Sequence, residues 1–457
     1  MSMKILHLFN FFFFISFFTN GLCNSYIHFP NKFSIPIPPS FDPNFHGRAF
    51  ILVSGKKHPP TFRAGLSLEP IPNNLYSCSL SVFLGPLKVW SSDHFSPFSP
   101  STTCVLDLTS NGVLQVHDGF GLVGWQTSTF SQQVQRLLLE KTGNLVLKDD
   151  NNCTKWQSFD YPTDTMLRGQ QLNAPFSLTS LNYSFEVLQD MLRISLNWRG
   201  QRYSYWELEP KRNISFARLG SIGLKLFDRN STKVAVIKGS SLSGKEPNKL
   251  LALKKDGNLG LYYYSAETGE LQASYQSSNN NTCQLPLPCG NYGICTSSNS
   301  CSCVAFVSIN GDVYDFCENG NEAKAKMVAL HGVDTVLMSS NSSLKLMNVS
   351  EDECVSSCMD ECSCVAARHN EHYSVCMHYG LVGGVREVER GGGHSYWVKV
   401  LEEKEKGGSG FERRVVVGAG VFNGLVFCLI LGLVFYCFFK RFYYKRTSDL
   451  PAVVNVT

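Results

Sequence analysis

The sequence predicts a mainly β extracellular chain with small disulfide-rich modules and one transmembrane helix. Three stretches share a pattern of alternating apolar residues around a Gly or Asn turn, which is typical of β-hairpins. The chain has 17 cysteines, of which Cys23 lies in the N-terminal leader and Cys428 and Cys437 lie in the apolar segment near the C-terminus, so that 14 remain. The apolar segment near the C-terminus is uncharged and long enough to cross a bilayer.

The bulk composition is that of a folded protein with several domains. The chain has 457 residues, of which 43% are hydrophobic and 17% charged, and this length suits two to four domains. The formal net charge is only +4. A charge this small argues against nucleic acid as the main partner.

The N-terminus has the features of a secretory signal peptide. Lys4 precedes an apolar run from Ile5 to Phe18, and small residues end it near Gly21. We expect a signal peptide over residues 1–23. An N-terminal membrane anchor is the alternative, but the run is shorter than the roughly 20 residues needed to span a bilayer.

The second apolar segment predicts a single membrane span at Val415–Phe439. It carries no charge and would extend roughly 37 Å as a helix, against a hydrocarbon core of about 30 Å. Basic residues follow directly within Lys440–Arg446, which places the C-terminus in the cytosol. We therefore expect a type I plasma-membrane protein with an extracellular ectodomain and a short cytoplasmic tail, 440–457.

The ectodomain cysteines and glycosylation motifs agree with this topology. An even number of cysteines in an oxidising compartment implies disulfides, and Cys78 with Cys104 could close one of them. The N-x-S/T motifs imply N-glycosylation. They begin at Asn152, Asn182, Asn213, Asn230, Asn280, Asn341 and Asn348.

The predicted hairpins are Leu106–Asp118, Leu137–Asp149 and Leu250–Tyr264. In each, a Gly supplies the positive φ of the turn and the flanking Leu and Val residues alternate inward. Similar units repeated along a chain predict a repeated β architecture.

The segment Trp156–Met166, WQSFDYPTDTM, fits neither a helix nor a strand period, and Pro162 restricts the residue before it to extended conformations. A structured loop is expected. Pairing Asp160 with Asp164 as catalytic acid and base is the alternative, but nothing else in the stretch supplies a nucleophile or a metal site.

These segments together resemble a plant family. The hairpins resemble bulb-type mannose-binding lectin modules, and WQSFDYPTDTMLRGQ resembles the segment that closes the first lectin domain of S-locus glycoproteins and S-receptor-like kinases. Cys283–Cys317 resembles an EGF-like module and Cys354–Cys376 a PAN/apple module. The resemblance implies a bulb-type lectin domain at 44–169, a second lectin-like domain at 170–282, an EGF-like module at 283–317 and an α+β PAN/apple domain at 327–401.

The resemblance also implies a tandem β-prism fold in which Trp156 and Phe159 plug one end of the first prism, while Asp160, Thr163 and Asp164 hydrogen-bond to backbone. It implies the pairs Cys354–Cys376 and Cys358–Cys364. Cys153 and one of Cys317 or Cys362 remain unassigned. The cysteines expected in disulfides are Cys78, Cys104, Cys283, Cys289, Cys295, Cys301, Cys303, Cys317, Cys354, Cys358, Cys364 and Cys376.

A helix is predicted at the start of the PAN-like region. Ser350 and Glu353 form a capping box, and Val349 can pack on Cys354 across the first turn. Cys354, Cys358 and Cys362 would then share one helical face that disulfides fix to a sheet.

In this family a sugar site has the pattern Q-x-D-x-N-x-V-x-Y. The first hairpin departs from it at every position, and the second keeps only Asn144 and Val146. The third keeps Asp256, Asn258 and Tyr262, with Lys254 in place of Gln, and is the candidate sugar site. A plain hairpin turn is the alternative for these residues, and mannose affinity should be weak throughout because partners are missing.

No other motif predicts chemistry. Gly119–Gly124 matches G-x-G-x-x-G, but no helical pattern follows it. His369, His372, Cys376 and His378 cluster like metal ligands but lack paired C-x2-C spacing. We expect no catalytic residues, no metal and no cofactor.

The sequence thus predicts a cell-surface receptor-like glycoprotein without a kinase. It would bind a carbohydrate, peptide or protein ligand and act through a kinase-bearing co-receptor or an oligomer. The alternatives are a structural or adhesive glycoprotein that contacts wall polysaccharide without signalling and, more remotely, a secretory-pathway enzyme.

Overall fold

The computed structural model describes most of the chain between Ser25 and Leu401, and all of these residues except Leu401 lie in one compact unit. The predicted signal peptide, membrane span and cytoplasmic tail lie outside the described residues. Among the residues that are described, no helix is long and apolar enough to cross a membrane. The described ranges are 25–55, 61–240, 249–265, 268–304, 325–339, 345–388 and 393–401.

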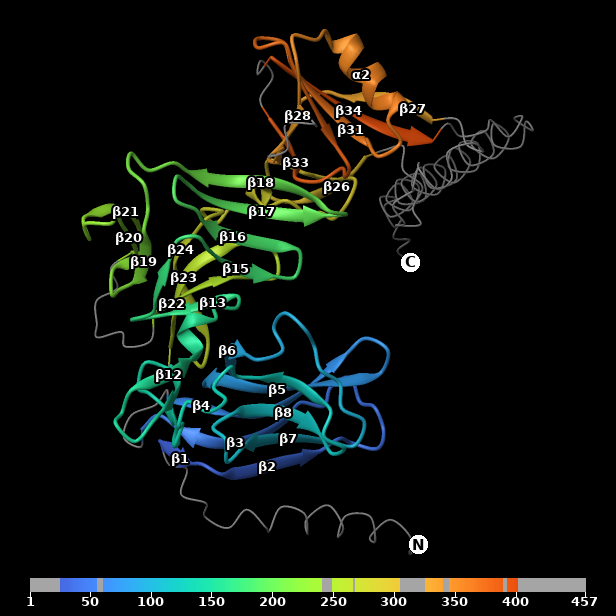
Figure 1. Ribbon diagram of the computed structural model, residues 1–457. Coiled ribbons are helices and arrows are strands. Elements are labelled where there is room, and N and C mark those ends of the chain that lie inside the picture. The colour runs from blue at the N-terminus through green and yellow to red at the C-terminus, as the bar shows by residue number, and fades with distance from the viewer. Residues whose placement is uncertain are drawn as a thin grey trace, which may run out of the picture. The chain divides into compact units, whose positions relative to one another are not determined.

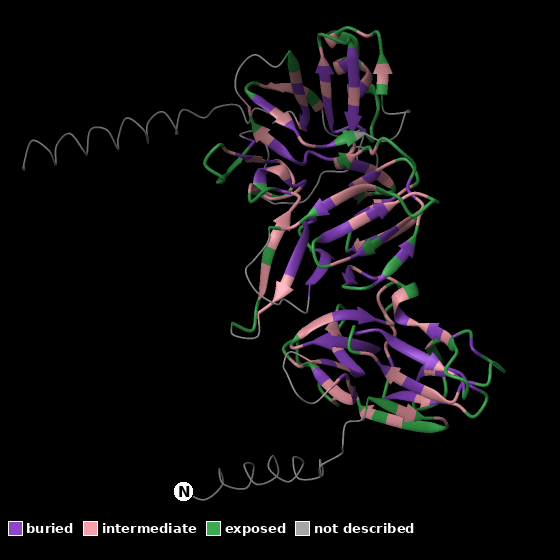
Figure 2. Cartoon of the chain, turned by 90° about the vertical axis from the view of Figure 1, so that its left-hand side faces the viewer, coloured by how far each residue is buried: buried purple, intermediate pink, exposed green. Residues whose placement is uncertain are grey.

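The prediction of a mainly β chain is confirmed. Strands dominate the described part of the chain, and α2 (Glu351–Asp360) is its one α-helix (Figure 1). Buried residues alternate with more exposed ones along many of these strands (Figure 2), as expected for sheets with one face toward a core.

Three four-stranded antiparallel sheets form the first β unit. One contains β3 (Gly47–Val53), β4 (Phe62–Ile71), β5 (Leu75–Leu84) and β6 (Leu87–Ser91); the next β2 (Asn31–Pro36), β7 (Thr103–Leu108), β8 (Leu114–Asp118) and β9 (Val123–Gln126); the last β1 (Tyr26–His28), β10 (Arg136–Leu139), β11 (Leu145–Lys148) and β12 (Thr154–Gln157).

The two N-terminal strands complete sheets made mostly from later residues. Strand β2 pairs with β7, with Asn31 opposite Leu108, and β1 pairs with β10, with Tyr26 opposite Leu138. The first unit therefore begins ahead of residue 44, where the sequence analysis placed its start. Each pairing covers a sheet edge that would otherwise present unpaired backbone groups.

The three predicted hairpins are present, and their turns have the same geometry. Gly112, Gly143 and Gly257 have φ angles of 86°, 87° and 85°. In each turn the glycine amide donates to the carbonyl three residues earlier, at 3.0 Å. The shared geometry follows from the shared pattern, since only glycine adopts this φ at no steric cost.

A cluster of three tryptophans joins the three sheets of the first unit. Trp90 lies on β6, Trp125 on β9 and Trp156 on β12, so each sheet contributes its fourth strand. The ring centroids are 5.8 to 6.1 Å apart and every pair meets edge to face, the arrangement that aromatic pairs favour. Phe159 packs against the same core, where the sequence placed it.

A hydroxyl two residues after each tryptophan holds the neighbouring strand. Ser92, Thr127 and Ser158 accept hydrogen bonds from the backbone amides of Leu80, Leu114 and Leu145, at 3.0, 3.1 and 2.9 Å respectively. The same contact thus occurs once in each sheet. These hydroxyls satisfy amides that would otherwise be buried without a partner.

The loop after β12 is architectural, but its hydrogen bonds differ from those expected. The Asp160 carboxylate accepts from the Gln157 amide at 2.8 Å, and the Asp164 carboxylate accepts from the Thr165 hydroxyl at 3.0 Å. Both carboxylates therefore bond to neighbouring side chains, where the sequence analysis expected backbone partners. The backbone carbonyl of Tyr161 accepts from Trp90 Nε1 at 2.9 Å, which ties the loop to the tryptophan cluster.

The second β unit repeats the three-sheet plan. Its third sheet is extended by β29, a strand that comes much later in the chain. The sheets contain β13 (Thr165–Leu167), β22 (Lys249–Leu253), β23 (Leu259–Tyr264) and β24 (Leu271–Gln276); β14 (Gln171–Asn173), β19 (Phe216–Leu219), β20 (Gly223–Phe227) and β21 (Lys233–Lys238); and β15 (Phe176–Ser180), β16 (Tyr183–Val187), β17 (Leu192–Trp198), β18 (Gln201–Leu208) and β29 (Met338–Ser339).

The C-terminal part of the described chain combines two sheets with α2. One sheet includes the disulfide-rich hairpin, and α2 packs on strands of the other. The first contains β25 (Gly293–Cys295), β26 (Cys301–Cys303), β28 (Val333–Thr335) and β33 (Val385–Glu387), and the second β27 (Ala325–Leu330), β30 (Lys345–Met347), β31 (Ala366–Asn370), β32 (Val375–Tyr379) and β34 (His394–Leu401).

Helix α2 begins as its sequence predicts. The Ser350 hydroxyl accepts from the Glu353 amide at 3.3 Å, and the Glu353 carboxylate accepts from the Ser350 amide at 2.8 Å. At the other end, Lys399 Nζ donates to the carbonyls of Met359 and Glu361 at 3.2 and 2.8 Å. A cation at a helix C-terminus also suits the helix dipole.

The prediction that Cys362 shares the helical face of Cys354 and Cys358 is wrong. Helix α2 ends at Asp360, and Glu361 takes an extended conformation with φ −89° and ψ 114°. Cys362 therefore follows the helix. Cys362 is disulfide-bonded, but its bond is not among the five that join two described residues.

Five disulfides join described residues. Cys303 was expected to be bonded, but its thiol is free and exposed, as is that of Cys153. The four other described cysteines of this module are bonded to one another in two pairs. The bonds are Cys78–Cys104, Cys283–Cys295, Cys289–Cys301, Cys354–Cys376 and Cys358–Cys364.

Trp156→Ala should lower the free energy of unfolding by about 3–5 kcal/mol, because it opens a cavity where three sheets meet. Thermal and denaturant unfolding of the purified protein would measure this. The matched control is Phe120→Ala, since the Phe120 side chain is 80% exposed and its loss should change stability by less than about 0.5 kcal/mol. Equal effects of the two substitutions would contradict the role of the tryptophan cluster.

Candidate functional site

The first hairpin uses its polar groups internally. The Thr109 hydroxyl bonds to the Asn111 side chain and to the Val113 carbonyl. The His117 ring is buried, with Nδ1 2.5 Å from the Asp118 carbonyl and Nε2 3.5 Å from the Asp107 carboxylate. These contacts leave little for a sugar to bond.

The second hairpin is closed in a similar way. Lys148 Nζ lies 3.7 Å from the Glu140 carboxylate. The Asn144 amide donates to the Gln157 side chain at 2.8 Å, and its carbonyl accepts from the Ser158 hydroxyl and the Phe159 backbone amide. Position 144 therefore retains the asparagine of the motif, but its side chain hydrogen-bonds to the end of β12 and to the loop that follows.

The third hairpin holds the residues that the sequence analysis proposed as a sugar site. Asn258 is only 6% exposed. Its amide donates to the Ser278 hydroxyl at 2.9 Å, and its carbonyl accepts from the Ser277 hydroxyl at 3.1 Å. Asp256 is exposed, but one of its oxygens accepts from the Asn258 backbone amide at 2.9 Å, a bond within the turn.

Tyr262 is directed away from solvent as well. It is 1% exposed, and burial raises the pKa of its hydroxyl to about 12. Lys254 Nζ, at the position of the motif glutamine, lies 4.7 Å from the centre of the Tyr262 ring, a cation–π contact. Asp256, Asn258 and Tyr262 thus share one hairpin, but only Asp256 is available to a ligand.

Gly260 is the sequence signal for this rearrangement. A Cβ at this position would lie 2.4 Å from the Tyr262 ring, so the valine of the family motif could not stand here. The ring occupies the space that the valine would fill. The third hairpin therefore resembles a sugar site in sequence more than in geometry.

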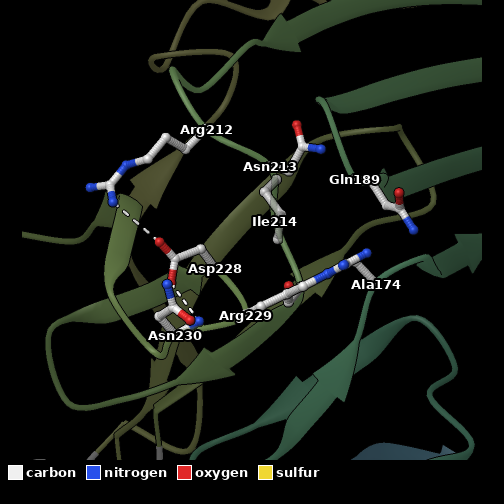
Figure 3. Close-up of a pocket in the computed structure, with 9 residues that line it drawn as sticks. Ala174, Gln189, Arg212, Asn213, Ile214, Asp228, Arg229 and Asn230 are labelled. Carbon is white, nitrogen blue, oxygen red and sulfur yellow. Dashed lines mark hydrogen bonds and ion pairs between the residues drawn. The ribbon is translucent and has the colours of Figure 1, made fainter.

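A pocket of about 650 Å³ lies in the second β unit (Figure 3). Arg212 Nη1 contacts the Asp228 carboxylate at 3.2 Å, and the other Asp228 oxygen accepts from the Asn230 backbone amide at 3.0 Å. The sequence analysis did not predict this pocket, because its residues come from four separate loops. Its lining is Ala174, Gln189, Arg212, Asn213, Ile214, Ser215, Asp228, Arg229 and Asn230.

Two of these lining residues are predicted glycosylation sites. Asn213 and Asn230 are both exposed, as are the other predicted glycosylation sites among the described residues. Asn341 lies outside them. A glycan on either asparagine would occupy space at this pocket, which makes it a poor site for a free ligand.

Among the clustered histidines of the PAN-like region, His369 and His378 bond within the protein, whereas His372 is exposed. His378 is buried and bonds to the Ser357 hydroxyl at 3.1 Å, while His369 Nε2 lies 2.9 Å from the Val349 carbonyl. Cys354, Cys376 and His378 lie within metal-ligand distance of one another. The two sulfurs are joined in a disulfide, so they cannot act as thiolate ligands.

Comparison with known proteins identifies two domains. The chain matches the D-mannose binding lectin family over residues 88–183 and the PAN-like domain family over residues 327–400. It is 30% identical over 237 residues to a G-type lectin S-receptor-like serine/threonine-protein kinase of Arabidopsis thaliana. The aligned region covers 47% of this chain and 26% of the relative.

Two further matches extend this comparison. A PAN domain-containing protein of Arabidopsis thaliana is 28% identical over 292 residues, covering 58% of each chain. The solved two-domain lectin Scilla campanulata agglutinin is 16% identical and covers 54% of this chain and 100% of its own, with a TM-score of 0.21.

The chain therefore contains regions that match the lectin and PAN-like domain families. It is similar to plant G-type lectin S-receptor-like kinases and to a PAN domain-containing protein, as the sequence resemblance predicted. Its matches span 26% and 58% of the length of the two relatives described above.

Asn258→Ala should destabilise the fold, because it leaves the Ser277 and Ser278 groups without their buried partner. We expect a loss of about 1–3 kcal/mol in the free energy of unfolding, measured by denaturant titration. Lys255→Ala, in the same turn but exposed, is the control and should be nearly neutral. An unchanged stability for Asn258→Ala would mean that the side chain is free for a ligand.

Proposed function

We propose that this chain is a receptor-like recognition glycoprotein of the plant plasma membrane, anchored by one span with its lectin-like and PAN-like domains outside the cell. The observation that carries the proposal is the combination of a mannose-lectin domain and a PAN-like domain in one disulfide-bonded chain. Receptor kinases with lectin domains are among its relatives.

The proposal includes a module between the lectin-like and PAN-like domains. We assign residues 283–317 as EGF-like, supported by the two interleaved bonds Cys283–Cys295 and Cys289–Cys301. Small modules of this kind depend on disulfides because they cannot build a sufficient core.

Binding is the activity that these domains support. Lectin and PAN domains are not catalytic, so signalling would require a kinase-bearing partner. The ligand would be a carbohydrate, peptide or protein that contacts surfaces other than the closed mannose hairpins.

Titration calorimetry with mannose should give no binding heat, even at millimolar sugar. The reason is that the motif positions of all three hairpins are substituted, paired or buried. Measurable mannose binding that is lost on Asp256→Ala would contradict this expectation, because Asp256 is the one motif carboxylate that remains exposed.

Immunoprecipitation of the tagged protein from plant membranes should recover a kinase-bearing receptor. A matched control is a tagged single-pass protein of unrelated ectodomain, expressed at the same level. If repeated precipitations after cross-linking recover wall polymer but no kinase, the receptor proposal fails and the adhesive function replaces it.

A further inference from the structure

One sheet of the second β unit has two very different faces. Strands β14, β19, β20 and β21 form this sheet. Its inner face is apolar, with Leu172, Ala217, Leu219, Leu224 and Leu226 buried. The alternating residues therefore lie on the opposite face, and we name this set the cationic face: Gln171, Asn173, Phe216, Arg218, Lys225 and Phe227.

The charge of this sheet is all of one sign. Its strands contain the cations Arg218, Lys225, Lys233 and Lys238 and no acidic residue. None of these four side chains has a carboxylate partner among the described residues. Asp228, at the turn between β20 and β21, is already paired with Arg212. A cluster of unpaired cations attracts an anionic ligand.

Two stacked aromatic rings form an apolar patch beside these cations. Phe216 and Phe227 are paired across β19 and β20, and their rings stack with centroids 4.8 Å apart and planes at 14°. The Arg218 guanidinium lies 5.9 Å from each ring centre. Both phenylalanines are partly exposed, so a ligand can reach them.

The arginine is also held in place by an amide. Arg218 Nε donates to the Gln171 side-chain oxygen at 2.9 Å, and Nη2 donates to the same oxygen. The remaining Nη1 and Nη2 hydrogens are the ones left for a ligand carboxylate. In the sheet register, Arg218 lies opposite Lys225, and Asn173 lies opposite Phe216. Neighbouring strands, about 4.8 Å apart, therefore present a cation pair in one row and an amide with aromatics in the next row, roughly 6.6 Å further along the strands.

We propose that the cationic face binds an anionic polysaccharide whose sugar units carry carboxylates, a polyuronate. An arginine can bond a carboxylate with two parallel hydrogen bonds. The phenylalanine patch suits the apolar C–H face of a sugar ring, and the amides suit its hydroxyls. This inference rests on the proposed extracellular recognition function and names the ligand class.

An acidic protein segment is the competing occupant. Charge alone does not distinguish the two, because lysine and arginine also attract glutamate-rich chains. The stacked phenylalanines distinguish them, since exposed apolar ring surface bordered by amides suits the mixed C–H and hydroxyl surface of a sugar ring. The same apolar surface gives an acidic side chain no specific contact.

The test measures binding of the full-length protein in detergent to immobilised oligogalacturonides. Two forms of the same oligomer serve as probes, one with free carboxylates and one fully methyl-esterified. We expect binding of the acidic form and little binding of the ester, because esterification removes the charge and keeps the sugar backbone. Equal binding of both forms would overturn the proposal.

Variants then locate the site. Arg218→Gln with Lys225→Gln should weaken acidic oligomer binding about tenfold or more. The matched control, Lys326→Gln with Lys345→Gln, removes the same charge from exposed positions on β27 and β30 and should change affinity less than about twofold. Equal losses in both double variants would show that only net charge matters and would overturn the site.

The aromatic contribution has its own variant. Phe216→Leu with Phe227→Leu keeps apolar volume and should weaken oligogalacturonide binding but leave binding of poly-glutamate unchanged. If poly-glutamate binds as well as the polyuronate and both are insensitive to this change, an acidic protein segment is the occupant.

Kinase recovery from membranes and polyuronate binding, both measured with the unsubstituted protein, separate the two proposals. Recovery of the kinase by a protein that does not bind polyuronate would contradict this inference alone. Polyuronate binding without any kinase would leave this inference standing and remove the receptor function.

Discussion

The edge-to-face contact among Trp90, Trp125 and Trp156 is the constraint on which the first β unit depends. Each ring comes from the last strand of a different sheet, so the contact fixes how the three sheets meet. The hydroxyls that follow two residues later then fix each fourth strand to its neighbour. The loop after β12 is held against the tryptophan cluster by the hydrogen bond from Trp90 to the Tyr161 carbonyl.

The same internal pairing explains why a lectin-like fold lacks open sugar hairpins. Asn144 and Asn258 use their amides to hold the loops after the fourth strands, and Lys254 covers Tyr262. Buried polar groups are usually paired, and the side chains of Asn144 and Asn258 find their partners within the protein. The polar surface still available lies elsewhere, on the outer residues of the sheet formed by β14, β19, β20 and β21.

Local patterns were predicted from the sequence and long-range ones were not. The hairpins and the capping box of α2 follow from residues a few positions apart, and all are present. The burial of Tyr262 depends on Gly260 and on a core the sequence does not display. The position of Cys362 depends on where α2 ends. Lys399, almost 40 residues later in the chain, caps that end. The edge strands β1 and β2 were missed because their partners are distant in sequence.

Those early edge strands have a consequence for synthesis. Tyr26–Pro36 is synthesised well before its partners around Leu108 and Leu138. Until those residues follow, β1 and β2 have open hydrogen-bonding edges, which are prone to mispairing. These two strands can therefore join their sheets only after more than a hundred further residues have been translated in the case of β1 and about seventy in the case of β2.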